Sequence, residues 1–228
     1  MTDVIGRRTM IGSAGTAILA SALAASIAAQ ETPRKQKLIA VCCSLRKGKT
    51  TSAALMHCLN AAKEQDPDLD TELIELAELS IPAQVALGMP LKPGEADDFP
   101  SVAEKLLDPA VTGIVVGSPV YFGTMSALCK AFLDRCMAFR KGFALHNKIA
   151  GALAVGGSRN GGQELTVQSI HTALMGQDVI IVGTGQPSVR IGATLWNQDD
   201  SIEADEFGIG TAKDLGRRIA VVSAAMAM

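Results

Sequence analysis

A basic, hydroxyl-rich stretch at residues 44–52 (SLRKGKTTS) has the side chains to bind an anion. It follows an apolar run at 38–43 that predicts a buried strand, and it leads into a helical pattern over 53–65. Backbone N–H groups at the start of a helix attract phosphate, and serine and threonine hydroxyls can add hydrogen bonds. The stretch therefore predicts a phosphate-binding loop, with a solvated basic turn as the alternative.

The end of this stretch also matches a nucleotide-hydrolase P-loop, whose pattern is G-x-x-x-x-G-K-[ST]. Residues 48–50 (GKT) fit the end of that pattern, but Cys43 stands where its first glycine belongs. That glycine lets the backbone curl around the phosphates. A hydrolase also needs a carboxylate for magnesium at a later strand end, and none follows the strand expected at 113–116. Both departures disfavour nucleotide hydrolysis.

Two further loops combine glycine with aromatic or basic residues. One covers 117–124, and its first three residues are expected to end the preceding strand. Tyr121 and Phe122 follow there, in a chain with only 4% aromatic residues. The other loop, GGSRNGGQE at 156–164, also follows an apolar run. Loops at the carboxyl ends of buried strands are where open α/β sheets bind ligands, although a tight turn with packed aromatics is the alternative for the first.

Apolar runs and helical spacings alternate along the chain, which predicts an α/β domain with a parallel sheet between two layers of helices. Five strands with right-handed crossovers fit the flavodoxin-like order 2-1-3-4-5, which brings the three loops to one edge. Two long segments, 77–100 and 183–200, are expected to be irregular, and the second holds the only tryptophan, Trp196. The last helix is expected to turn Phe207 and Leu215 inward. Strands are expected at 38–43, 73–76, 113–116, 149–155 and 179–182, and helices at 53–65, 101–107, 125–139, 165–175 and 205–225.

The composition argues against several classes of partner and site. With a net charge of −2 and a pI of about 5.9, the chain offers no basic surface for nucleic acid or an anionic membrane. Its 48% hydrophobic residues are ample for the core of one domain. The cysteines include no C-x-x-C pair, which favours buried free thiols over a metal site, with a disulfide through Cys129 or Cys136 as the alternative. They are Cys42, Cys43, Cys58, Cys129 and Cys136.

Residues 1–29 have the layout of an export signal. Arg7 and Arg8 precede an apolar, alanine-rich stretch, and SIA at 26–28 supplies the small residues of a cleavage site. The paired arginines and weak hydrophobicity favour a twin-arginine signal, a route that exports proteins already folded. We therefore expect a folded domain at 30–228 in the periplasm, or on the outer face of the membrane if the signal stays uncleaved. An ordinary Sec signal or an uncleaved anchor is the alternative.

The three loops together resemble those of the NADPH-dependent FMN reductase and iron–sulfur flavoprotein group of flavodoxin-like proteins. SLRKGKTT at 44–51 is close to that group's S-x-R-x-G-x-x-T phosphate loop. GSPVYFG at 117–123 is near its G-S-P-V-Y motif, and GGSRNGGQE at 156–164 completes the set. The similarity spans about residues 37–222.

This resemblance implies where an FMN cofactor would bind. A flavin ring needs a flat apolar or aromatic wall and nearby backbone N–H groups, and glycines allow the backbone to come close. The phosphate would be held by Ser44, Arg46, Lys49, Thr50 and Thr51. The isoalloxazine ring would be lined by Pro119, Val120, Tyr121, Phe122 and Gly123, and approached at its other edge by Gly157, Ser158, Arg159 and Gly162.

The chain departs from the group in two ways. Iron–sulfur members carry a compact set of cysteines between the second strand and the G-S-P-V-Y loop, whereas residues 77–111 contain no cysteine. Because a cluster needs thiolates, we expect no iron–sulfur cluster and no other metal site. The export signal would also place the protein away from cytoplasmic NAD(P)H, which leaves the electron donor open.

We therefore expect an FMN-dependent oxidoreductase of the NAD(P)H-dependent FMN reductase type, exported in folded form. The alternatives are an FMN electron carrier that serves a periplasmic or membrane redox partner, and a binding protein that has lost the flavin. The resemblance also implies a homo-oligomer, either a dimer or a tetramer. No catalytic residue is assigned, because His57, His146 and His171 lie outside the three loops and Ser158 has no evident His/Asp partners for hydrolysis.

Overall fold

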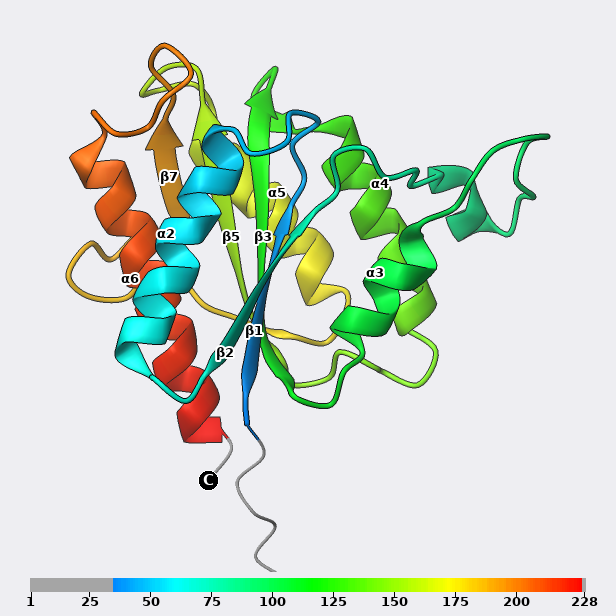
Figure 1. The fold of residues 1–228 in the computed structure, drawn as a ribbon, viewed down its shortest axis with the longest axis horizontal. Coiled ribbons are helices and arrows are strands. Elements are labelled where there is room, and N and C mark those ends of the chain that lie inside the picture. Colours follow the sequence, from blue (N-terminus) through cyan, green and yellow to red (C-terminus); the bar gives the residue numbers. More distant parts are fainter. Residues whose placement is uncertain (1–34, 227–228) are drawn as a thin grey trace, which may run out of the picture. The chain divides into compact units, whose positions relative to one another are not determined.

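A computed structural model of the chain describes residues 35–226, which form a sheet with helices on both faces (Figure 1). The export signal expected at 1–29 lies outside the described residues. Neighbouring strands follow the order β2-β1-β3-β5-β6, while β4 pairs with β3 and β7 pairs with β5. The strands are β1 (Lys37–Cys42), β2 (Asp70–Glu75), β3 (Val111–Tyr121), β4 (Thr124–Met125), β5 (Ile149–Gly156), β6 (Ile180–Ile181) and β7 (Ala193–Trp196). The helices are α2 (Thr50–Gln65), α3 (Phe99–Leu106), α4 (Ala127–Arg135), α5 (Gln163–Met175) and α6 (Glu206–Met226), with short 3-10 turns η1 (Ala83–Leu87) and η2 (Cys136–Phe139).

Two hydrophobic cores give the three layers that the sequence predicts. One core lies between the sheet and helices α2 and α6, and the other between the sheet and helices α3, α4 and α5. Residues next to each other in β1 alternate between them: Cys42 faces the first core and Val41 the second. All five cysteines are buried and free, as expected from their apolar settings. None of the helices within 35–226 is long and apolar enough to cross a membrane.

The third strand is longer than expected, and the expectation that Gly117-Ser118-Pro119 ends it is wrong. β3 continues to Tyr121, since Gly117 pairs with Leu153 and Pro119 with Val155 of β5. Proline is tolerated there because the pairing with β1 stops at Gly117, so its missing N–H breaks no ladder bond on that side. The strand then turns at Phe122-Gly123 and forms a short hairpin with β4.

The fifth position of the sheet is shared by two short strands, which corrects the expected single strand at 179–182. β6 pairs with the start of β5 at Ile149 and Ala150, and β7 pairs with its end from Leu153 to Gly156. The chain between them leaves the sheet, and Thr184 N–H donates to Arg190 O at 2.9 Å to close this excursion. The segment 183–200, expected to be irregular, therefore contains the strand that supports the end of β5.

A buried ion pair anchors the long segment between β2 and α3. Arg135 of α4 donates from both terminal nitrogens to the two carboxylate oxygens of Asp97, each at 2.8 Å, and also to Pro82 O at 3.2 Å. The guanidinium lies 4.6 Å from the centre of the Phe99 ring. The hydrogen bonds from Arg135 hold the pKa of Asp97 below its ordinary value. This pair ties the segment to α4, although its outer part extends away from the sheet (Figure 1).

We predict that Asp97→Asn lowers the free energy of unfolding by about 3 kcal/mol at neutral pH, because the buried Arg135 charge loses its partner. A carboxyl group whose pKa is lower in the folded protein stabilises the fold at pH values above its pKa in the unfolded chain, which is near 4. That stability is lost as the pH falls through the pKa of the group in the folded protein. Wild type and variant should therefore converge in acid, in urea unfolding measured across the pH range.

The matched control is Asp134→Asn, which removes a surface carboxylate that pairs with Lys130 at 44% and 59% side-chain exposure. It should cost no more than about 0.5 kcal/mol. Equal effects of the two substitutions would show that the Asp97–Arg135 pair does not anchor the segment.

Candidate functional site

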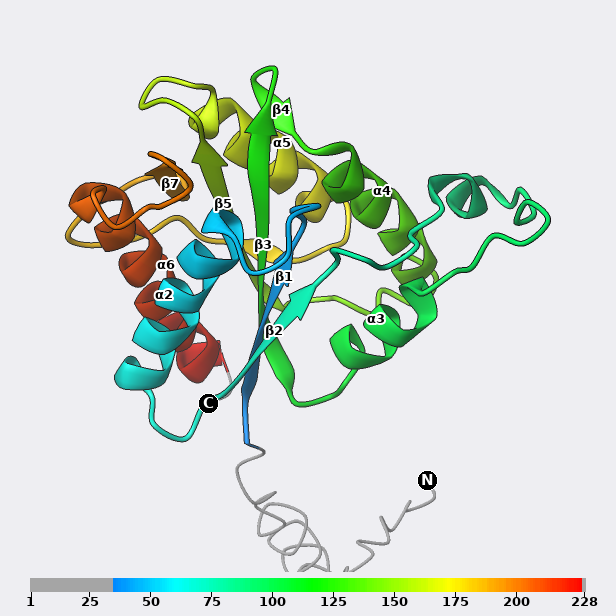
Figure 2. The ribbon, with the colours of Figure 1, turned by 45° about the horizontal axis from the view of Figure 1, so that its top comes forward.

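The three candidate loops meet at the carboxyl edge of the sheet, seen from above in Figure 2. Hydrogen bonds fix the first loop against the second: Cys43 N–H donates to Gly117 O at 2.8 Å, and Ser126 Oγ donates to Cys43 O at 2.7 Å. Ser126 also accepts from Cys129 N–H at 3.0 Å and so caps α4. Its own N–H donates to Ser118 Oγ at 2.9 Å, which closes the base of the β3–β4 hairpin.

The first loop ends at a helix N-terminus that no side chain caps. α2 begins at Thr50, three residues earlier than expected, and Lys49 at its N-cap position makes no capping hydrogen bond. Thr50, Thr51 and Ser52 are buried, yet no hydrogen bond within 35–226 uses their side chains. Backbone N–H groups and hydroxyls are thus left without protein partners at the positive end of a helix. This arrangement fits a phosphate group.

The basic side chains of this loop already share a carboxylate. Arg46 Nη1 lies 2.6 Å from Asp200 Oδ1, and Lys49 Nζ lies 2.8 Å from Asp200 Oδ2. The hydrogen bonds from Lys49 and Arg46 lower the pKa of Asp200. Ser44, which is buried, accepts from Arg46 N–H at 3.1 Å and so shapes the turn. An anion at this loop would meet both cations at the rim, where Asp200 competes with it for them.

The aromatic loop is the tip of the β3–β4 hairpin. Phe122 and Gly123 have φ angles of 49° and 77°, the positive values that such a tight turn requires. Tyr121 is half exposed and the Phe122 side chain is fully exposed. The Val120 side chain is partly buried and packs against the core beneath α3, α4 and α5. Pro119, next to Val120, is half-buried.

The second and third loops touch through two glycines. Gly162 has a φ of 99°, and a Cβ built on it would lie 2.7 Å from the Cα of Gly123. Only glycine allows this approach, because a side chain would clash with the hairpin backbone and strain the left-handed conformation. The Gly157 position on the same loop is different, since a Cβ there would meet no atom within 4 Å. The third loop thus packs on the hairpin at one end and leaves open space at the other.

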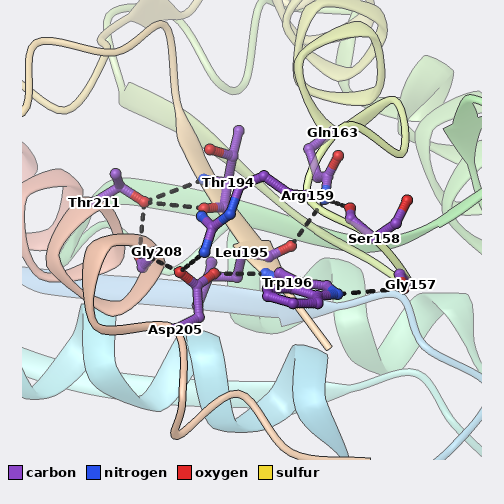
Figure 3. Close-up of polar contacts among 10 residues, drawn as sticks. All are labelled: Gly157, Ser158, Arg159, Gln163, Thr194, Leu195, Trp196, Asp205, Gly208 and Thr211. Carbon is purple, nitrogen blue, oxygen red and sulfur yellow. Dashed lines mark hydrogen bonds and ion pairs between the residues drawn. The ribbon is translucent and has the colours of Figure 1, made fainter. Parts of the chain in front are cut away.

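Gln163 holds the third loop from inside. Its amide nitrogen donates to Ser158 O at 2.6 Å and to Leu195 O at 3.2 Å (Figure 3). Its amide oxygen accepts from Gly161 N–H at 2.9 Å. The side chain is buried and fills the space above Gly156, where a Cβ would lie 2.5 Å from the amide nitrogen. The loop is therefore tied to β7 as well as to β5.

Asp205 supports the same loop from the start of α6. One carboxylate oxygen accepts from Arg159 at 2.7 Å and from Gly208 N–H at 2.9 Å, and the other accepts from Trp196 N–H at 2.7 Å. The Trp196 ring lies beneath the Arg159 guanidinium at 5.4 Å and donates from Nε1 to Gly157 O at 3.3 Å (Figure 3). The carboxylate is fully buried, whereas Arg159 is half exposed. Arg159 is therefore held in place by protein groups and still reaches solvent.

The structure brings all three predicted loops to one edge and adds residues that the sequence analysis missed. These are Asp200, Gln163, Trp196 and Asp205. Two of them carried a usable signal: Trp196 is the only tryptophan, and Asp205 stands where an expected helix begins, a favoured capping position. Asp200 lies 154 residues from Arg46 and gives no local signal. His57, His146 and His171 lie on α2, before β5 and on α5, outside the three loops, as expected.

This geometry belongs to a flavodoxin-like α/β fold. A solved flavodoxin, a WrbA-like protein from Agrobacterium tumefaciens, superposes with a TM-score of 0.54 at 18% identity, covering 84% of this chain and 98% of that one. At that identity the likeness shows the fold alone.

Sequence comparison gives the family. The profile of the NADPH-dependent FMN reductase family matches residues 36–194. An iron–sulfur flavoprotein of Methanocaldococcus jannaschii is 36% identical over 190 residues, covering 82% of this chain and 96% of the relative. An NAD(P)H dehydrogenase (quinone) of Chromohalobacter salexigens is 32% identical over 173 residues, covering 68% and 83%. The chain belongs to the NADPH-dependent FMN reductase family, a family of FMN-dependent oxidoreductases, as the three loops predicted.

We predict that Gly162→Ala lowers the free energy of unfolding by about 1–3 kcal/mol, because the added methyl meets the Gly123 backbone at a strained φ. Gly157→Ala is the control on the same loop. It should change stability by less than about 0.5 kcal/mol, since the methyl enters open space. Urea unfolding of both variants measures the difference, and equal losses would contradict the contact between the two loops.

Proposed function

We propose that this chain binds FMN at the carboxyl edge of its sheet and acts as an oxidoreductase that takes electrons from a reduced nicotinamide dinucleotide. One observation carries the proposal. The start of α2 is uncapped, and its Thr50, Thr51 and Ser52 hydroxyls have no protein partner within 35–226. It lies at the same edge as the two loops that meet at Gly123 and Gly162. A phosphate group would accept hydrogen bonds from the start of α2, and a flat ring would lie beside the two loops.

The phosphate of FMN would be held by the first turn of α2. Backbone N–H groups and the hydroxyls of Thr50 and Thr51 would donate to it, and the Ser44 turn shapes the approach. Arg46 and Lys49 would add positive charge from the rim, shared with Asp200. The helix terminus therefore supplies most of the recognition, since its donors have no competing partner.

The ring of the flavin would lie between the hairpin and the third loop. Tyr121, Phe122 and Pro119 offer aromatic and apolar surface, while Val120 and Gly123 offer backbone. The open space at Gly157 lets the third loop come close, with Ser158 and Gly162 beside it. Arg159, held by Asp205, would place a positive charge near this edge. When bound, FMN supplies the two-electron and one-electron chemistry, and the chain supplies position and electrostatics.

The proposed donor is NADH or NADPH. The family is described as NADPH-dependent FMN reductase, and a relative that covers 68% of this chain is named NAD(P)H dehydrogenase (quinone). Tyr121 and Phe122 are exposed on the hairpin, so a second flat ring can reach this surface from solvent. The alternative is an FMN electron carrier that does not react with NADH or NADPH. The donor experiment below distinguishes the two.

We also propose that the protein works without an iron–sulfur cluster, although several relatives are named iron–sulfur flavoproteins. All five cysteines are buried in the two cores, and burial raises the pKa of Cys42 to about 11 and that of Cys58 to about 12. Within 35–226 no three His, Cys, Asp or Glu side chains are grouped to hold a metal. Analysis of iron and acid-labile sulfide in protein purified without oxygen tests this, and stoichiometric amounts of both would contradict it.

Export in folded form and assembly into a homo-oligomer complete the proposal. The twin arginines at 7–8 support export by the folded-protein route to the periplasm. Replacement of both by lysine should keep the protein in the cytoplasm of its host, and unchanged periplasmic delivery would contradict this route. Light scattering of the purified protein measures whether it is a dimer or tetramer.

We predict that Thr51→Val weakens FMN binding about tenfold, because one charge-assisted hydrogen bond to the phosphate is lost while the side-chain shape is kept. Binding of riboflavin, which has no phosphate, should change little. Fluorescence titration of both flavins measures the two affinities. Thr172→Val, on the exposed side of α5, is the control and should alter neither. An equal loss for FMN and riboflavin would show that Thr51 does not recognise the phosphate.

For the donor, we predict that NADH or NADPH, added without oxygen, bleaches the visible absorbance of the FMN-loaded protein. Reduction that needs dithionite, with neither nucleotide effective, would contradict the nicotinamide donor and favour the electron carrier. Absence of flavin binding even after reconstitution would instead overturn the cofactor assignment, so the two failures are distinguishable.

A further inference from the structure

The short turn that follows β7 carries two aspartates at its tip. Gln198 and Ser201 pair as an antiparallel bridge, with N–H to O distances of 2.8 Å in both directions, so Asp199 and Asp200 are the two central residues of a hairpin turn. Both have positive φ angles, 48° and 65°. Turns of this kind favour Asn-Gly or Asp-Gly, because glycine adopts a positive φ at no steric cost. Asp200 therefore stands where glycine would suit the backbone better.

The chain on both sides of this turn is anchored to the fold. At one end Asn197 N–H donates to Gly156 O at 2.8 Å, and at the other end Ile202 is buried in the core beneath α2 and α6. Asp205 N–H then donates to Ile202 O at 2.9 Å. Figure 1 shows the turn, in orange after β7, at the same edge of the sheet as the blue loop after β1. The tip of the turn therefore has a fixed place at the edge where the candidate loops meet.

From this place the Asp200 side chain reaches the first loop. Its two oxygens contact different cations, Arg46 Nη1 at 2.6 Å and Lys49 Nζ at 2.8 Å. The neighbouring Asp199 side chain makes no hydrogen bond and no ion pair within the described chain. The contact with two cations is thus what aspartate supplies at position 200 in place of glycine.

A phosphate at the start of α2 would attract the same two cations. Lys49 is the N-cap residue of α2, and the buried side chains of Thr50 and Thr51 make no hydrogen bond within 35–226. A phosphate monoester carries about −1.5 to −2 charges at pH 7, whereas a carboxylate carries a single charge. The Arg46 and Lys49 side chains are 51% and 49% exposed, so they are not packed into one arrangement. One pair of cations is therefore within reach of two anions.

We propose that Asp200 is an internal competitor for the phosphate of FMN and lowers the affinity of the chain for this flavin, an inference that rests on the FMN site proposed above. Without FMN, the carboxylate pairs with Arg46 and Lys49. When FMN binds, its phosphate takes these cations and Asp200 loses its partners. Riboflavin has no phosphate and leaves the two ion pairs in place, so the effect is specific to the phosphorylated flavin.

Fluorescence titration of the full chain with FMN and with riboflavin tests this. Asp200→Asn should bind FMN about three- to tenfold more tightly than the wild type and riboflavin equally, since two exposed ion pairs no longer have to be broken. Asp200→Gly should do the same in a turn that glycine suits, so a failure to fold does not obscure the result. Asp199→Asn is the matched control in the same turn and should leave both affinities as in the wild type.

A double-mutant cycle shows whether Asp200 acts through the two cations. In a chain that already carries Arg46→Gln and Lys49→Gln, Asp200→Asn should no longer raise the affinity for FMN, because no cation is left to release. The dependence on salt gives a second readout. Added NaCl should weaken FMN binding less in the wild type than in Asp200→Asn, since the wild type exchanges one set of ion pairs for another, whereas the variant forms new ones.

Several results would overturn the proposal. These are unchanged or weaker FMN binding in the folded Asp200→Asn and Asp200→Gly variants, an equal gain for riboflavin, an equal gain in Asp199→Asn, or a gain that persists without the two cations. Each requires that the wild type binds FMN, so it leaves the proposed FMN site intact. If neither the wild type nor any variant binds FMN, the proposed function fails and this inference fails with it.

Discussion

The parallel pairing of β1, β3 and β5 is the constraint on which the candidate site depends. Cys42 pairs with Gly117, and Gly117 pairs with Leu153, so the three strands end within a few residues of one another. The loops that follow must then share one edge, whatever their own sequences prefer. β7 extends this frame by pairing with the end of β5, where the third loop begins. The edge that the candidate loops share follows from this register.

The polar residues at this edge are of two kinds: some are fully hydrogen-bonded within the protein, and others have side chains without a partner in the described chain. Gln163 and Asp205 use all their polar atoms within the protein, and they fix the third loop from below. The start of α2 shows the opposite pattern, since its hydroxyl side chains have no protein partner in the described chain. A fold tolerates such open donors where a ligand or solvent satisfies them. The contrast separates the groups that position the site from those that can bind.

Sequence reasoning succeeded where signals are local and failed where they are long-range. Alternating apolar runs predicted the layers and the shared edge, because burial dictates residue type along each strand. The extension of β3 through Pro119 depended on where β1 ends, which the local sequence does not show. Phe207 was expected inside but is half exposed, and Arg190 stacks on its ring at 5.5 Å. The contacts of Asp200 with Arg46 and Lys49 likewise join segments that are distant in sequence.

The central claim is that the uncapped start of α2 and the two loops that meet at Gly123 and Gly162 form one FMN site. A crystal structure of the protein with FMN tests it most directly. The account predicts density for the phosphate at the N–H groups and hydroxyls of the first turn of α2, with the ring between the β3–β4 hairpin and Gly157. Flavin density elsewhere on the protein, or an FMN-treated crystal with only solvent at that edge, would contradict it.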